Sequence, residues 1–461
     1  MTPLRKQRLT LWEPLGPHTF RVPAALCLLV LSCLTFTDLA SRLFALPPQS
    51  TRPSTHTDES QVPPYTLPDP LRFDNGDLVE TVADWQDRRR PEILKLFAEQ
   101  MYGVAPPAPE RINFKVVEES SEALNGKAIR KQIAISLTPG PAPVVMTMLL
   151  YVPKSVESAP VFWGLNFRGN QAVTSDPAVL VNPNWMTDSS SAKGEIVNNR
   201  ATEMTRGKAA SRWPIELLID RGYALATAYY GDIDPDFDDG FQNGVHPAFY
   251  RPGQTRPDEH EWGAIAAWAW GLSRGLDYLQ QEPLVNGNKV AAIGHSRLGK
   301  TALWAGATDQ RFALVISNNS GSCGAALEHR IFGETLTLIN FVRPHWLCGN
   351  FKHYNNREAD LPVDAHELIA LIAPRPVYIA SASEDLAADP KGEFLAAAGA
   401  DPVYRLLGTN GFGSADLSTM PVPETPLIDG TIGYHVRTGK HDITITDWRH
   451  YLDFADRYLK K

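Results

Sequence analysis

One serine lies where a buried strand is followed by a helix. Residues 289–296 read KVAAIGHS, an apolar run that ends in small residues, and residues 297–307 follow as RLGKTALWAGA. A serine at a sharp strand-to-helix turn projects its hydroxyl outward, and the N-terminus of the helix offers backbone N–H groups to an oxyanion. Ser296 is therefore the candidate nucleophile for attack on a carboxylic ester.

The glycines around Ser296 depart from the usual spacing. The common motif is G-x-S-x-G, whereas here Gly294 is followed by Gly299, one position late, with Leu298 in the expected slot. A serine that only caps a helix after a strand would give a similar pattern. The motif by itself leaves both interpretations open.

A nucleophilic serine needs a base, and the base needs an acid that orients it. In the α/β-hydrolase fold the chain order is serine, then acid, then histidine, with the acid just after a later strand. The run RPVYIASAS at residues 375–383 predicts such a strand. Asp385 follows it, with Glu384 beside it and Asp389 nearby. We predict Asp385 as the acid.

The base is expected on a loop near the end of the chain. The segment YHVRTGKHDITITDW offers His435 and His441. His441 follows Gly439 and precedes the final helical pattern, as a base carried on a loop would. We therefore predict the catalytic triad Ser296, Asp385 and His441.

The rest of the chain predicts the fold that would position these residues. Apolar runs of strand length alternate with helical patterns, which is typical of a mostly parallel sheet covered on both faces. We predict a doubly wound α/β sheet of the α/β-hydrolase fold. The predicted strands lie at 146–153, 159–167, 223–234, 289–296, 312–320 and 375–383, and the clearest helices at 261–281 and 447–461.

Several motifs together resemble one enzyme family. The motifs are GHSRLGK at 294–300, DQRFALVISNNSG at 309–321, HWLCGNF at 345–351, ALIAPRPVYI at 370–379 and HVRTGKHDITITDW at 435–448. From about residue 70 onward the chain resembles the glucuronoyl esterases, carbohydrate esterase family 15, and the resemblance accounts for the displaced glycine. It implies an α/β-hydrolase that needs no metal or cofactor. It also implies cleavage of 4-O-methyl-glucuronoyl esters between xylan and lignin alcohols.

The resemblance also assigns roles by position. Arg297 would stabilise the oxyanion together with backbone N–H groups. Lys300, one helical turn further on, and Glu334 in IFGET would hydrogen-bond the sugar hydroxyls. A surface lysine and a solvated glutamate are the alternatives for these two.

Two positions depart from the family pattern. Many members carry a glutamate as the acid within S-N-E-S-G, where this chain has Asn319; other bacterial members use an aspartate that corresponds to Asp385. Relatives commonly have a tryptophan at the position of Ala387, where its ring forms a wall against the uronic acid. The missing ring removes an aromatic platform of about 1 kcal/mol, for which Trp346 is a candidate replacement.

These departures keep two other functions open. The loss of the aromatic wall at Ala387 motivates an acetyl esterase on xylan, or another carbohydrate esterase. Asn319 is the single argument for a non-catalytic carbohydrate-binding protein, and the intact Ser296, Asp385 and His441 count against it.

The N-terminal region predicts export. Four basic residues (Arg5, Lys6, Arg8 and Arg21) precede an uncharged apolar stretch at 22–37. This pattern is typical of a signal for export, or of an uncleaved membrane anchor. We predict an export signal or anchor at 1–45, a linker rich in Pro, Ser and Thr at 46–70, and a catalytic domain at 71–461. The protein would be periplasmic, secreted or held at the membrane by the N-terminal segment alone.

Composition narrows the partners. The 461 residues carry a net charge of −8, which argues against nucleic-acid binding. A carbohydrate ester is the predicted partner, and we expect a monomer. Cys323 and Cys348 either form a disulfide in an oxidising compartment or stay as buried thiols, and no Cys/His cluster suggests a metal.

Overall fold

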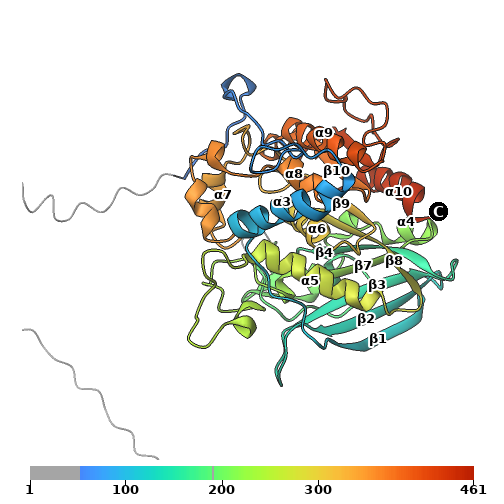
Figure 1. Ribbon diagram of the computed structural model, residues 1–461. Helices are drawn as coiled ribbons and strands as arrows, with labels where there is room; N and C mark the ends of the chain where they lie inside the picture. Colours follow the sequence, from blue (N-terminus) through green and yellow to red (C-terminus); the bar gives the residue numbers. More distant parts are fainter. Residues whose placement is uncertain (1–51, 189–191, 461) are drawn as a thin grey trace, which may run out of the picture. The chain divides into compact units, whose positions relative to one another are not determined.

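The computed structural model describes residues 52–188 and 192–460 (Figure 1). The predicted export segment at 1–45 therefore lies outside the described residues. Within the described part of the chain, no helix combines the length and the apolar character that crossing a bilayer requires.

The centre of the protein is a nine-stranded sheet with the order β1-β2-β3-β7-β4-β8-β9-β10-β11. The six strands from β7 to β11 in that order are parallel, and β1, β2 and β3 form an antiparallel edge that joins β7. The strands are β1 (Asn113–Ala123), β2 (Ala128–Ser136), β3 (Val145–Pro153), β4 (Ala159–Asn166), β7 (Ala224–Tyr229), β8 (Val285–His295), β9 (Leu314–Asn318), β10 (Val377–Ala382) and β11 (Ile432–Arg437). A separate hairpin is formed by β5 (Ile196–Val197) and β6 (Arg200–Ala201).

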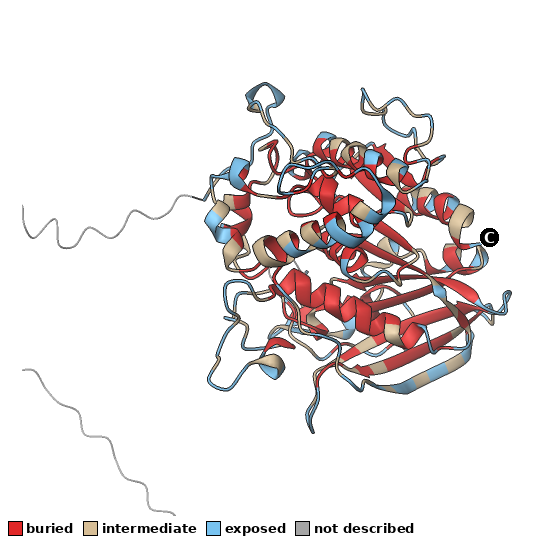
Figure 2. Cartoon of the chain, viewed as in Figure 1, coloured by how far each residue is buried: buried red, intermediate tan, exposed pale blue. Residues whose placement is uncertain are grey.

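Helices cover both faces of the sheet (Figure 1). They are α2 (Val82–Asp84), α3 (Arg90–Phe97), α4 (Ile215–Asp220), α5 (Ala264–Leu279), α6 (Arg297–Thr308), α7 (Leu336–Val342), α8 (Ala365–Ala370), α9 (Pro390–Leu406) and α10 (Ile445–Leu459). Figure 2 shows α5 as buried almost throughout, whereas the edge strand β1 is largely exposed. The predicted doubly wound α/β fold is confirmed.

Alternating side chains of the central strands pack into two separate cores. In β4, Val161 and Trp163 join the cluster that includes α5, α6, α8 and α9, whereas Phe162 joins the cluster of α4 and α10. Because successive strand residues point to opposite faces, an apolar run such as APVFWGLN supplies both cores at once. This is why the strand could be predicted without an alternating pattern.

The antiparallel edge buries charged side chains as well as apolar ones. Arg130 on β2 is buried and pairs with Glu118 and Asp176, and Lys131 is buried against Glu282. Buried charges are tolerated when each has a partner. The run AIRKQIAIS therefore forms a strand although charged and polar residues interrupt its apolar pattern.

The start of the described chain packs on the catalytic body. We call residues 52–62 the N-terminal strap. His56 forms an antiparallel bridge with Gly333, and Glu59 pairs with Arg330 and Lys391. The chain from Arg52 onward belongs to one compact unit that extends to Lys461. Within the linker predicted over 46–70, the strap is thus held on the catalytic body by the backbone of His56 and the carboxylate of Glu59.

Candidate active site

Ser296 occupies the turn between β8 and α6. It follows the last strand residue, His295, and precedes the first helical residue, Arg297. Its backbone has φ 59° and ψ −132°, a conformation that is costly for a residue with a side chain and is typical of strained functional turns. The Ser296 N–H donates to the carbonyl of Asn318 (2.9 Å), which fixes the turn against β9.

The geometry explains the displaced glycine. A Cβ on Gly294 would lie 1.8 Å from the carbonyl oxygen of Leu298, so no other residue fits there. A Cβ on Gly299 would lie 3.0 Å from Oγ of Ser317 in β9 and 2.9 Å from Cβ of Ser320, just after the end of β9. Close packing of α6 on β9 thus requires glycine at 299, while Leu298 is buried without conflict.

The predicted acid and base meet. Asp385 lies just after β10, and His441 lies on the loop between β11 and α10. His441 Nδ1 and Asp385 Oδ2 are 2.6 Å apart. Burial by itself would raise the pKa of Asp385, but the hydrogen bonds of His441 and Asn319 outweigh it and lower the pKa below its usual value. Asp385 is thus held ionised beside the imidazole.

Asn319 is part of the same arrangement. Its Nδ2 donates to Asp385 Oδ2 at 2.9 Å. Its backbone is left-handed (φ 46°), which asparagine tolerates better than most residues. The amide therefore orients and stabilises the carboxylate, at the position where an alternative acid was sought in the sequence.

Two of the other candidates, His435 for the base and Asp389 for the acid, have structural roles. His435 is fully buried between Tyr378 and Asp447. Asp389 caps α9 and pairs with Arg330. Neither lines the pockets at Ser296.

Arg297 is held beside Ser296 by a carboxylate and two rings. Its guanidinium pairs with Asp236, and it lies 4.9 Å from the ring centre of Trp346 and 5.5 Å from that of Phe167. Asp236 also accepts from Trp346 Nε1 (2.7 Å) and bonds His345 Nε2 (2.9 Å). Burial would raise the pKa of Asp236, but these partners lower it well below its usual range. Arg297 is thereby kept charged and in place.

Lys300 lies one turn along α6 and is buried. Its Nζ donates to the backbone carbonyls of Ser320 and Ser322. The ammonium is therefore held on the loop that follows β9, 6.0 Å from the ring centre of Trp346. It is not the surface lysine that the sequence left open.

Two pockets meet at Ser296, Arg297 and His441, which line both of them. We call them the large pocket, of about 660 Å³, and the small pocket, of about 240 Å³. An ester bound with its carbonyl at Ser296 would place its acyl part in one pocket and its alcohol in the other.

The large pocket contains the predicted sugar-binding residues. Lys300, Glu334 and Trp346 all line it, together with Ala387. Trp346 is 6% exposed and is covered by Arg297 and Arg343. Its ring therefore supports cations more than it offers a free wall.

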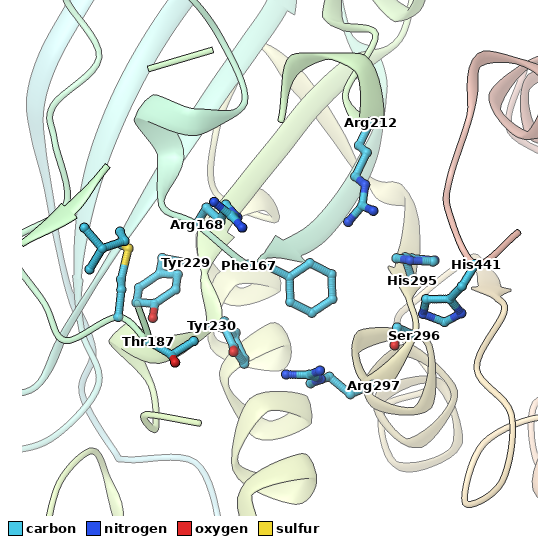
Figure 3. Close-up of a pocket in the computed structure, with 12 residues that line it drawn as sticks. Phe167, Arg168, Thr187, Arg212, Tyr229, Tyr230, His295, Ser296, Arg297 and His441 are labelled. Carbon is cyan, nitrogen blue, oxygen red and sulfur yellow. The ribbon is translucent and has the colours of Figure 1, made fainter. Parts of the chain in front are cut away.

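The small pocket is more aromatic. Figure 3 shows Phe167 between Arg212 and Arg297, with Tyr229 and Tyr230 further from Ser296. Its remaining lining residues are Arg168, Met186, Thr187, Ile196, His295, Ser296 and His441.

Comparisons with known proteins show the family of this chain. A family model described as "Glucuronyl esterase, fungi" matches residues 242–408. A relative from an unknown prokaryotic organism, named "Carbohydrate esterase MZ0003", is 49% identical over 87% of this chain and 91% of its own. The chain belongs to the glucuronoyl esterases, carbohydrate esterase family 15.

Solved structures of this family share the fold. One, described as a promiscuous family 15 esterase from a marine bacterial metagenome, is 49% identical with a TM-score of 0.81, and the match covers 88% of this chain and all of that one. The glucuronoyl esterase of Solibacter usitatus is 45% identical with a TM-score of 0.80, over 86% and 99% of the two chains. The protein is therefore an esterase of the α/β-hydrolase fold.

Some residues of this esterase site were missed in the sequence. Asp236 lies in the acidic loop GDIDPDFDDG after β7, and Phe167 directly follows β4. Both follow the carboxyl ends of parallel strands, where sites of open α/β sheets form. That position was the available signal, but the loop contains five acids and the sequence does not say which one faces Arg297.

The two cysteines of the catalytic domain are buried thiols. Cys323 and Cys348 are both free and buried, so the disulfide alternative is wrong. Burial raises the pKa of Cys348 to about 11 and that of Cys323 well above its usual value, which keeps both thiols protonated. Over residues 52–188 and 192–460, no group of three or more His, Cys, Asp or Glu residues is arranged to hold a metal ion.

Proposed function

We propose that the protein hydrolyses 4-O-methyl-glucuronoyl esters that join xylan to lignin alcohols, with Ser296 as nucleophile. The observation that carries the proposal is that two pockets meet at Ser296 and His441. The large one is lined by Lys300 and Glu334, which suit a sugar, and the small one by the rings of Phe167, Tyr229 and Tyr230, beside Arg168 and Arg212. An ester of a sugar acid with an aromatic alcohol has two halves of matching character. Family membership supports the same substrate class.

In the first step, His441 removes the proton of the Ser296 hydroxyl while the oxygen attacks the ester carbonyl. Asp385, 2.6 Å from Nδ1 of His441, holds the ring with Nε2 free to accept that proton and stabilises the imidazolium. The negative charge that develops on the carbonyl oxygen is stabilised by Arg297 and by backbone N–H groups at the start of α6. The alcohol leaves with the proton from His441.

In the second step, water replaces the alcohol. His441 takes a proton from the water, whose oxygen attacks the acyl-enzyme, and then returns the proton to Ser296. The uronic acid is released as a carboxylate. Arg297, Lys300 and Arg343, which line the large pocket, would bind this anion.

The acyl group belongs in the large pocket. Lys300 can donate to sugar hydroxyls and Glu334 can accept from them. The alcohol would then lie in the small pocket, where Phe167 can pack against an aromatic ring. Trp346 would act through Arg297 and Lys300, which lie over its ring.

The test uses benzyl glucuronate with the protein from residue 52 onward, so that the strap is kept. Turnover is expected for the wild type, and Ser296→Ala is expected to lower kcat by about 10⁴-fold or more, because the attacking oxygen is removed. Glu384→Gln, next to the predicted acid, serves as a control with little effect. Activity of Ser296→Ala near that of the wild type would overturn the proposal.

A second candidate is an acetyl esterase acting on decorated xylan. Ala387 offers the large pocket only a methyl group, and one relative is described as promiscuous. The two functions are separated by comparing kcat/KM for benzyl glucuronate with that for 4-nitrophenyl acetate. Turnover of the acetate alone would favour the acetyl esterase.

We also propose that residues 1–45 direct export and that the protein acts as a monomer outside the cytoplasm. The basic start and the apolar stretch at 22–37 support export. Cell fractionation of the full chain, with and without residues 1–45, tests the first point. Light scattering of the purified protein tests the second.

A further inference from the structure

The N-terminal strap forms part of the rim of the large pocket. Arg52, its first residue, lines the same pocket as Ser296, Glu334 and Ala387. In Figure 1 the blue start of the described chain lies beside α7, which also contributes lining residues. A segment far from the triad in sequence therefore reaches the substrate site.

The strap is hydrogen-bonded directly to the segment that carries Glu334, a predicted sugar-binding residue. The N–H and carbonyl groups of His56 and Gly333 bond each other at 3.0 and 2.5 Å, and the N–H of the next residue, Glu334, donates to the carbonyl of Ala387 at 2.9 Å. A Cβ on Gly333 would lie 2.4 Å from that same carbonyl oxygen. The strap, Glu334 and the loop of Ala387 thus pack side by side without a gap.

A second anchor holds the middle of the strap. Glu59 accepts from Arg330, which is buried and also pairs with Asp389 (2.9 Å). Lys391 donates to the other oxygen of Glu59 at 2.5 Å. Asp389 caps α9 just after the loop of Ala387. The strap is therefore fixed both to the segment of Gly333 and Glu334 and to the start of α9, next to the loop of Ala387.

The side chain of Arg52 is available to a ligand. It is exposed, and no ion pair or hydrogen bond of this side chain is found with the part of the chain that the structure describes. Lys300 is 2% exposed and lies at the bottom of the same pocket. A sugar acid whose ester carbonyl lies at Ser296 would be bound by Lys300 and Glu334. The glycan chain attached to that sugar would then lie at the rim of the large pocket, beside Arg52.

We infer that Arg52 binds the glycan chain that carries the uronic acid. This inference rests on the proposed function and deepens it. The guanidinium presents five N–H donors, which suit the hydroxyl and ring oxygens of neutral xylose units. Arg52 would be a specificity-determining residue that favours glucuronate attached to an oligosaccharide over the free monosaccharide.

The test compares two benzyl esters, one of 4-O-methyl-glucuronic acid and one of the same acid attached to xylotriose. Arg52→Ala is expected to raise KM for the oligosaccharide ester about five- to tenfold, the size of one hydrogen bond. We expect kcat for both esters, and KM for the monosaccharide ester, to change less than about twofold. Arg111→Ala, which removes an exposed arginine before β1, is the matched control.

A binding measurement keeps the inference separate from the proposed function. Calorimetry with the glucuronoyl-xylotriose acid, which needs no turnover, compares Ser296→Ala with Ser296→Ala/Arg52→Ala. A five- to tenfold weaker Kd in the double variant supports the inference even if the wild type cleaves no glucuronate ester.

Equal Kd values would overturn the inference while leaving the esterase intact, and so would a KM rise of the same size for both esters. Glu59→Gln provides a second variant that loosens the strap without touching Arg52. It is expected to raise KM for the oligosaccharide ester selectively as well, and to a smaller extent.

Discussion

The two pockets at Ser296 rest on different foundations. The loop 319–323 under the large pocket is held by buried carboxyl groups: Glu393 accepts from the N–H of Gly321 (2.9 Å) and Glu328 from the hydroxyl of Ser322 (2.6 Å). Burial raises the pKa of both to about 8. Under the small pocket, His295 is bonded to Asn318 (2.6 Å) and packs beside Phe167.

This difference predicts how each pocket recognises its half of the ester. Burial lowers the pKa of His295 well below its usual value, so the small pocket rests on a neutral ring. Arginines line both pockets, but only the large pocket lies above the carboxyl groups of Glu328 and Glu393, whose pKa is about 8. We therefore expect changes in the large pocket to depend on the acyl group and on pH, and changes in the small pocket to depend on the shape of the alcohol.

The largest expected effect is a loss of activity on every ester, because both pockets share His441 as the base. Asp385→Asn is expected to lower kcat about 10⁴-fold for every ester, since the amide favours the wrong tautomer of His441. The measurement is kcat on benzyl glucuronate and on 4-nitrophenyl acetate. A loss confined to one of the two substrates would contradict the shared triad.

A substitution in the large pocket should act on the acyl group. Lys300→Met keeps the length of the side chain but removes a charged hydrogen bond, and KM for benzyl glucuronate should rise about 10- to 100-fold. The KM for 4-nitrophenyl acetate should change little. Lys115→Met, at an exposed position on β1, is the matched control. Equal effects on both esters would show a general loss of structure instead.

A substitution in the small pocket should act on the alcohol. Phe167→Ala is expected to lower the ratio of kcat/KM for the benzyl ester to that for the methyl ester about three- to tenfold, because an aromatic contact is lost. Phe341→Ala, which changes an exposed ring of the large pocket, should leave that ratio unchanged. A ratio unaffected by Phe167→Ala would place the alcohol elsewhere.

The last effect is on stability and not on catalysis, and it concerns the loop under the large pocket. Glu393 keeps its proton in the folded protein to about pH 8, whereas its usual pKa is 4.5. Between these values the folded state binds the extra proton, so the contribution of Glu393 to stability falls as pH rises, by up to about 1.4 kcal/mol per pH unit. Glu393→Gln removes this dependence, and its stability relative to the wild type should increase from pH 5 to pH 8.

Urea unfolding at pH 5, 6.5 and 8 measures this change. Glu216→Gln, at an exposed position on α4, is the control and should leave the pH dependence as in the wild type. Parallel curves for Glu393→Gln and the wild type would mean that the carboxyl is already ionised in the folded state.

Much of the fold could be predicted because the buried strands are apolar. The runs that became β3, β4, β7, β8, β9 and β10 were all predicted, as were α5 and α10. The strands β1, β2 and β11 were not. On β2 the charge of Arg130 is compensated by Glu118 and Asp176, and on β11 His435 and Arg437 share Asp447. Such pairings involve distant residues that no local pattern reveals.

The site, too, could be predicted only in part. Chain order predicted Asp385 and His441, and the structure brings them within hydrogen-bonding distance; their catalytic roles remain predictions. The partner of Arg297 was not predicted, because Asp236 is one of several acids in its loop. The contacts of the strap were not predicted either, since the Pro, Ser and Thr content of the predicted linker says nothing about Gly333 or Lys391, which are hundreds of residues away in the chain.

The contacts of the strap also bear on the order of folding. Glu59 and Lys391 are 332 positions apart in the chain, and contacts of such long sequence separation form late, because a large loop must close first. During synthesis the strap emerges early, long before its partners Arg330, Gly333 and Lys391. We therefore expect the triad loops and the sheet to assemble before the rim of the large pocket is complete, so that a newly folded molecule gains its chemistry before its full selectivity.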